Sequence, residues 1–242
     1  MKKTRYPEID SAGGLRNALD IAFEKIGAAL RVSNSEELNR LPLSYARVKK
    51  DNRFSQIYIA AEEKLYLPDF WRDGVCLGRG KTEHIDILAE CIDYWLTTEA
   101  NTKDLADKFS FITLNKDAKI FDDGKEVEHK WQTILNDPDR KEIRSFVELA
   151  INDPILSTLF PYTSLMTLCF SRCTGYPFTY DTPTVSPIID SGQYLVRKNE
   201  IDIIGSGSAA EALKFVLDNL PKDIGPAVKG TSETYKLLSP PP

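Results

Sequence analysis

The hydrophobic and polar positions along this chain follow two spacings, and each spacing predicts one kind of secondary structure. In four segments, apolar side chains recur three or four residues apart, as they do on the buried face of an amphipathic helix. These helical segments are residues 11–32, 82–96, 137–151 and 208–220. The last three have start signals, namely Thr82 as an N-cap, Asp137 before Pro138, and Ser208 with Glu211 as a capping box.

Shorter runs rich in β-branched and aromatic residues predict strands between these helices. The expected strands are residues 54–60, 64–67, 75–77 and 165–171, with a hairpin over 193–204. Turn-forming pairs separate the first three runs, so we expect them to form an antiparallel meander. Asp123-Gly124 is typical of a tight hairpin turn, and residues 174–187 are expected to form a loop rich in Thr, Pro and Tyr.

The order of these elements predicts the fold class and the division of the chain. Helix, strands and helix are followed by turn elements and then again by helix, strands and helix. We therefore expect an α+β protein of two interlocked halves, each a small antiparallel sheet packed with helices. The boundary is expected between Ile112 and Trp131. This places an N-terminal half at residues 1–115, a C-terminal half at 116–235 and a frayed tail at 236–242.

Composition and charge exclude several classes of protein. Hydrophobic residues make up 42% of the 242 residues and charged residues 28%, a globular composition that excludes intrinsically disordered and collagen-like chains. Lys and Arg total 31 against 36 Asp and Glu, which gives a net charge of −5, and no long basic run occurs. Because nucleic-acid phosphates require a dense positive face, we expect no nucleic-acid partner. An acidic chain favours a basic protein partner instead.

Other sequence features bear on localisation and on metal binding. No run approaches the roughly 18 apolar residues that a membrane helix needs, and no apolar core follows the basic N-terminal residues as in a signal peptide. We therefore expect a cytoplasmic protein that does not enter a membrane. The four cysteines, Cys76, Cys91, Cys169 and Cys173, form no Cys-x-x-Cys pair, and there are only two histidines. Buried reduced thiols are expected, without a metal site.

Common catalytic and cofactor motifs are absent or lack their structural context. Residues 205–210 have the glycine spacing of a dinucleotide-binding loop, but too few residues follow to complete that fold. We interpret them as a turn that leads into a capped helix. His84 and His129 have no neighbouring nucleophile and are interpreted as surface or half-buried side chains. We therefore expect no cofactor and assign no catalytic residue.

The most unusual segment, residues 159–178, gathers aromatic rings, hydroxyls, two thiols and one arginine. A guanidinium presents a planar fork of donors, so Arg172 can hold a carboxylate or a carbonyl of a ligand. Arg172 can also fix an irregular loop by bonding to the carbonyls of that loop, and the sequence leaves both interpretations open. The candidate binding residues are Ser171, Arg172, Cys173, Thr174 and Tyr176.

The same segment resembles a bacterial family of unknown function whose members are labelled natural-product biosynthesis proteins. The resemblance covers roughly residues 54–232, and its most specific part is the run Phe-Ser-Arg-Cys-Thr-Gly-Tyr-Pro at residues 170–177. Other similar segments occur in the order of the family, at residues 78–95, 109–112, 131–135, 159–169, 192–196 and 220–230. The resemblance implies a bacterial setting but no established catalytic residues.

Two functional hypotheses follow from these observations. The first is a non-enzymatic protein-binding protein of the bacterial cytoplasm, of the immunity or adaptor type, which binds a basic protein encoded beside it. Ten tyrosines and three tryptophans supply aromatic anchors for such an interface. The second is an accessory or tailoring enzyme of natural-product biosynthesis that uses Arg172, Cys173, Tyr176 and His84. An enzyme requires these side chains in one concave pocket, so finding them bonded to backbone groups would remove its main support.

Overall fold

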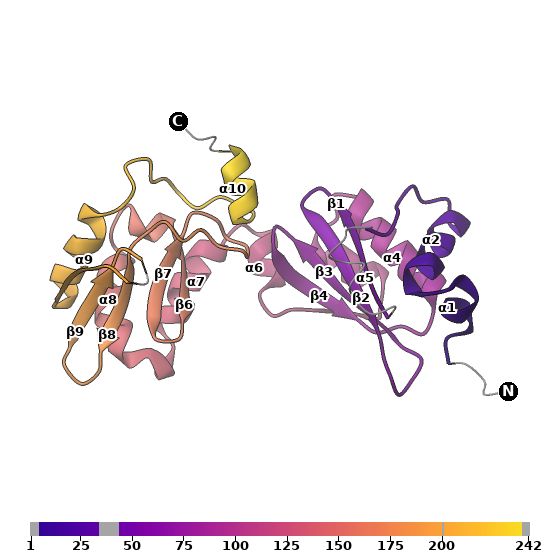
Figure 1. The fold of residues 1–242 in the computed structure, drawn as a ribbon, viewed down its shortest axis with the longest axis horizontal. Helices are drawn as coiled ribbons and strands as arrows, with labels where there is room; N and C mark the ends of the chain where they lie inside the picture. The colour runs from indigo at the N-terminus through magenta and orange to yellow at the C-terminus, as the bar shows by residue number, and fades with distance from the viewer. Residues whose placement is uncertain (1–4, 34–43, 200, 239–242) are drawn as a thin grey trace. The chain divides into compact units, whose positions relative to one another are not determined.

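The computed structural model describes residues 5–33, 44–199 and 201–238, and the chain divides into two compact units. The units are Met1–Asp122 and Asp123–Pro242. Each contains a five-stranded antiparallel sheet whose strands lie side by side in chain order, together with helices (Figure 1). This confirms the predicted α+β class with two sheet-containing halves. The division follows Asp122, inside the interval from Ile112 to Trp131 named above.

The first unit is a meander with helices against one face. Its strands are β1 (Tyr45–Lys50), β2 (Arg53–Ile59), β3 (Tyr66–Arg72), β4 (Val75–Gly80) and β5 (Ile112–Leu114). Its helices are α1 (Pro7–Ala12), α2 (Leu15–Lys25), α4 (Ile85–Thr97), α5 (Thr102–Lys108) and α6 (Ala118–Asp122). Side chains from α2, α4 and the sheet share one core, in which Phe23, Ile57, Phe70 and Trp95 are fully buried.

The second unit repeats the plan of a meander with helices on one face. Its strands are β6 (Phe160–Ser164), β7 (Thr167–Ser171), β8 (Thr184–Ile188), β9 (Gln193–Arg197) and β10 (Ile203–Gly207). Its helices are α7 (Glu126–Leu135), η1 (Pro138–Ile143), α8 (Arg144–Ala150), η2 (Leu156–Thr158), α9 (Ala209–Asp218) and α10 (Ser232–Leu238). Trp131 of α7 and Phe146 of α8 are buried against the sheet, and the Trp131 indole donates to the Leu159 carbonyl at 3.1 Å.

Alternation along the strands gives the second sheet one buried face and one open face. Leu168 and Phe170 of β7 belong to the core beneath α7, α8 and α9, as do Tyr194 and Val196 of β9. Successive side chains of a strand point to opposite faces. The intervening residues of β7 and β9 therefore face away from the helices, and this open face carries the candidate site.

Two helix predictions in the first unit differ from the structure at their boundaries. The sequence predicts one helix over residues 11–32, but Gly13 and Gly14 adopt φ values of 77° and 140°, which separate α1 from α2. The sequence also predicts Thr82 as an N-cap, whereas α4 begins after His84. The Thr82 hydroxyl accepts a hydrogen bond from the His84 amide at 3.2 Å and so acts just before the helix.

Three predictions about turns, loops and chain ends also differ. Asp123-Gly124 joins α6 to α7 and closes no hairpin. The sequence predicts a frayed tail from residue 236, but α10 continues to Leu238. Residues 239–242 lie outside the described residues. The loop predicted over residues 174–187 ends earlier, because β8 begins at Thr184 and pairs with β9.

The glycine-rich residues 205–210 are explained by packing and by helix capping. A Cβ added to Gly205 in β10 would lie 2.5 Å from the Phe215 ring of α9. The predicted capping box is confirmed, since the Glu211 carboxylate accepts from the Ser208 amide at 2.8 Å and the Ser208 hydroxyl caps α9. Strand β10 runs antiparallel to β9. A dinucleotide-binding loop instead follows a strand of a parallel sheet.

The contact between Gly205 and Phe215 gives a stability prediction. The substitution Gly205→Ala should lower the free energy of unfolding by about 1–3 kcal/mol, because the new methyl group forces Phe215 out of its position. Urea unfolding followed by circular dichroism measures the change. Gly225→Ala is the matched control, since no atom lies within 4 Å of its added Cβ. Equal unfolding midpoints for the two variants would contradict the packing explanation.

Candidate functional site

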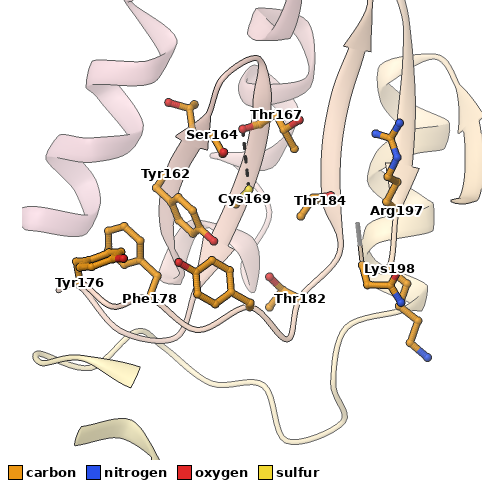
Figure 2. Close-up of a pocket in the computed structure, with 13 residues that line it drawn as sticks. Tyr162, Ser164, Thr167, Cys169, Tyr176, Phe178, Thr182, Thr184, Arg197 and Lys198 are labelled. Carbon is orange, nitrogen blue, oxygen red and sulfur yellow. Dashed lines mark hydrogen bonds between the residues drawn. The ribbon is translucent and has the colours of Figure 1, made fainter. Parts of the chain in front are cut away.

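A pocket of about 640 Å³ lies on the open face of the second sheet. Its volume is in the range typical of small-ligand sites. Figure 2 shows that aromatic side chains, including Tyr176 and Phe178, line one end, while Arg197 and Lys198 line the other. The pocket therefore has an aromatic end and a cationic end.

Strand register builds the floor of the pocket. Tyr162 of β6 pairs with Cys169 of β7, and Thr184 of β8 pairs with Arg197 of β9. Because Leu168 pairs with Val185 across β7 and β8, Cys169 and Thr184 are also neighbours. The four side chains form one row across four strands, in the order Tyr162, Cys169, Thr184 and Arg197 (Figure 2).

The aromatic end is a packed group of rings centred on Phe178. The Phe178 ring stacks on Tyr162 with centroids 4.4 Å apart and meets Tyr176 edge-on at 5.9 Å. Tyr180 meets Tyr162 edge-on at 6.3 Å. Tyr176 and Tyr180 nevertheless remain 65% and 68% exposed. The packed rings orient these two tyrosines, and their exposed surface is available to a ligand.

The cationic end is oriented by a chain of hydroxyl groups. Arg197 Nη1 donates to Ser186 Oγ at 3.2 Å, and the Ser186 and Thr167 hydroxyls are hydrogen-bonded at 2.8 Å. Lys198 follows Arg197 and is exposed. No carboxylate or histidine is among the described residues that line the pocket. Positive charge is therefore the only formal charge on its described lining at neutral pH.

The thiol and the neighbouring phenol in the floor are held in their neutral forms. Burial raises the pKa of Cys169, and this exceeds the opposing effect of its hydrogen bond with Tyr162. Burial likewise raises the pKa of the Tyr162 phenol. A thiol needs its thiolate form to act as a nucleophile. The floor of the pocket is therefore suited to packing and hydrogen bonding.

Arg172, a predicted binding residue, lies outside the lining of this pocket. Only 3% of its side chain is exposed, and its Nε lies 2.9 Å from Asp181 Oδ2. Its Nη1 and Nη2 donate to the two Asp223 oxygens at 2.9 and 3.2 Å, and Nη1 also donates to the Tyr235 hydroxyl at 2.6 Å. Burial lowers the pKa of the guanidinium, but these hydrogen bonds raise it by more. Arg172 thus joins the aromatic loop to the C-terminal segment.

Three more of the predicted residues also support the loop. The Ser171 hydroxyl donates to the Cys173 carbonyl at 2.7 Å and accepts from the Cys173 amide at 3.0 Å. The Thr174 amide donates to the Val228 carbonyl at 3.0 Å. Burial raises the pKa of the Cys173 thiol. Tyr176 alone among the five predicted residues lines the pocket, and a ligand-binding role for the five stays a prediction.

Sequence reasoning missed the residues that form the row across the floor. Tyr162, Cys169, Thr184 and Arg197 belong to four different strands, and their proximity depends on pairing between segments far apart in the chain. Period-two alternation around Leu168 and Val196 places Cys169 and Arg197 opposite the core. That signal identifies the open face, but it does not identify which strands are neighbours.

Within residues 5–33, 44–199 and 201–238, no three His, Cys, Asp or Glu side chains gather to hold a metal ion. The four cysteines are free thiols. His84 is exposed before α4 of the first unit. None of the helices formed by the described residues has the length and apolar character needed to cross a membrane.

Comparison with known proteins matches the second unit alone. The profile of a family of unknown function, DUF6193, matches residues 125–231. This segment includes all of the pocket residues and lies inside the wider range of the resemblance described above. No curated protein and no solved structure matches the chain. The second unit is therefore similar to a family whose description states no activity.

The pair formed by Asp223 and Arg172 predicts how stability depends on pH. The hydrogen bond from Arg172 holds the pKa of Asp223 below its ordinary value of 3.8 in the folded state. The unfolded chain therefore binds a proton at Asp223 more readily than the folded chain does. The contribution of the pair to the free energy of unfolding is complete above pH 3.8 and is lost as the pH falls below it. Unfolding in urea between about pH 6 and pH 2 should show a smaller acid-induced loss for Asp223→Asn than for the wild type.

The control for this measurement is Asp190→Asn, at a carboxylate in the turn between β8 and β9. This variant should follow the wild-type dependence on pH. Identical curves for Asp223→Asn and the wild type would show that the pair with Arg172 adds no acid-sensitive stability.

Proposed function

We propose that this protein is a non-enzymatic binding protein of the adaptor type, and that its second unit receives a partner protein at the pocket. The observation that carries the proposal is the combination of stacked rings, exposed tyrosines and neutral floor groups in one pocket. Aromatic anchors that fill or border a pocket supply most of the affinity at protein interfaces. Tyr176 and Tyr180 are the anchors in this proposal.

Exposed apolar residues beside the pocket also support a partner protein. Leu165 and Met166 form the turn between β6 and β7, flanked by Ser164 and Thr167 of the pocket lining. Leu165 is 90% exposed and has a φ of 53°, a conformation that apolar residues rarely adopt. Arg140 holds the turn by donating to the Leu165 carbonyl at 2.8 Å. Together with Met166, which is 41% exposed, Leu165 extends the apolar surface beside the pocket, where a partner protein can cover it.

The enzyme hypothesis receives less support from the same residues. Ser171, Cys173 and Thr174 are engaged with backbone groups, and Arg172 is engaged with Asp181 and Asp223. These interactions use the groups that a tailoring enzyme would direct at its substrate. A role in natural-product biosynthesis stays a prediction that rests on the resemblance.

The nature of the partner also stays a proposal. The expectation of a basic partner, and with it the immunity interpretation, rests on the net charge of −5. The pocket itself carries Arg197 and Lys198, so a basic partner would have to place its positive charges on other surfaces of the chain. A cytoplasmic location in a bacterium is part of the same proposal.

Light scattering coupled to size-exclusion chromatography tests this proposal with purified proteins. The full-length chain is mixed with the product of each neighbouring gene, and a stoichiometric complex is expected with one of them. In the double variant Tyr176→Ser/Tyr180→Ser, affinity should fall by at least tenfold, because both anchors lose their rings. Tyr58→Ser, at an exposed tyrosine of β2 in the first unit, is the control and should bind normally.

Two outcomes would count against the proposal. A complex that the double variant forms as tightly as the wild type would place the interface away from the pocket. The absence of a complex with every neighbouring product would remove the adaptor function in this form.

A further inference from the structure

The pocket separates aromatic surface from positive charge along a single row of side chains. Tyr162 stands at one end of the row and Arg197 at the other, with Cys169 and Thr184 between them. The pocket therefore offers a ring surface and a cationic surface to the same ligand.

The guanidinium of Arg197 is oriented but not saturated by its described partners. Its hydrogen bond to Ser186 uses one of five donors, and Ser186 is held in turn by Thr167. Among the described residues, Arg197 and Lys198 form no salt bridge, in contrast to the buried Arg172 with its two aspartates. A planar fork of this kind binds a carboxylate or phosphate through two parallel hydrogen bonds.

The aromatic end complements a flat apolar group. Tyr180 and Tyr176 expose ring surface beside the stack of Phe178 on Tyr162, and rings of this kind pair with an incoming ring in stacked or edge-on geometry. The Thr184 side chain, midway along the row, places a hydroxyl between the two ends. A cationic ligand would be repelled by Arg197 and Lys198.

We infer that the pocket binds an aromatic group that carries a negative charge on a short spacer. This chemistry occurs at the C-terminal phenylalanine or tyrosine of a protein chain and in free arylalkanoic acids. The inference rests on the proposed binding function of the same pocket and names the group that the pocket receives. It assigns Arg197 as the residue that binds the anion, with Lys198 as an additional positive charge.

Fluorine NMR titrations of the full-length protein test this inference with three probes. N-acetyl-4-fluorophenylalanine mimics a C-terminal aromatic residue, and its carboxamide is the neutral counterpart of the same size. The third probe, 3-(4-fluorophenyl)propionate, represents a free acid without a peptide group. We expect the N-acetyl acid to bind about tenfold more tightly than its carboxamide, because the charge-assisted bonds to Arg197 are absent from the carboxamide.

Substitutions of Arg197 and Lys198 test which residue causes the difference in affinity between the acid and its carboxamide. Arg197→Met should lower the affinity for the N-acetyl acid to that for the carboxamide, and it should leave the affinity for the carboxamide unchanged. Lys198→Met, at an exposed position, should weaken the acid about twofold to threefold. Arg144→Met removes one charge from the exposed surface of α8 and is the matched control, with unchanged binding of all probes. Equal urea midpoints for Arg197→Met and the wild type establish that the variant is folded.

Each outcome of the titrations decides the inference. Binding of both acids supports it and shows that a free acid is sufficient, whereas binding of the N-acetyl acid alone supports it and points to a chain terminus. Equal affinity for acid and carboxamide, no effect of Arg197→Met, or no binding of any probe would overturn it. A partner complex that is lost in the tyrosine double variant but unchanged in Arg197→Met would preserve the proposed function and reject the inference.

Discussion

The buried guanidinium of Arg172 holds together segments of the second unit that are distant in the sequence. It lies just after the last residue of β7. It forms an ion pair with Asp181 in the aromatic loop and donates hydrogen bonds to Asp223 after α9 and to Tyr235 in α10. A buried guanidinium is costly unless its charge is compensated, and the two aspartates supply that compensation. This requirement fixes the loop that presents the pocket tyrosines, and the pocket depends on it although Arg172 is not part of the lining.

The same strands produce both the core and the candidate site. Along β7 and β9, one set of alternating side chains packs beneath the helices, while the other set supplies Cys169 and Arg197 to the open face. Tight packing on the core side holds each strand in register. The pocket floor is consequently a rigid surface, and its charge and ring positions follow from the core beneath it. A binding function uses such a preorganised surface directly.

Local patterns were sufficient to predict much of the fold but only part of the site. The capping box at Ser208 and the helical spacing of apolar residues through Trp95 each depend on a short stretch of sequence. The structure contains both helices. The segment around Arg172 was identified as unusual, and Tyr176 from that segment does line the pocket. The hydrogen-bond partners of Arg172 could not be predicted, because Asp223 and Tyr235 lie 51 and 63 residues further along the chain.

The sequence by itself determined the α+β class, the presence of two sheet-containing halves and the start of the last long helix. These properties depend on hydrophobic periodicity and capping, which act over a few neighbouring residues. Tertiary structure decided that Arg172 supports the loop and that Tyr162, Cys169, Thr184 and Arg197 share one face. Those outcomes depend on strand register and on burial. Both are set when distant segments pack against a common core, so no short stretch of sequence contains them.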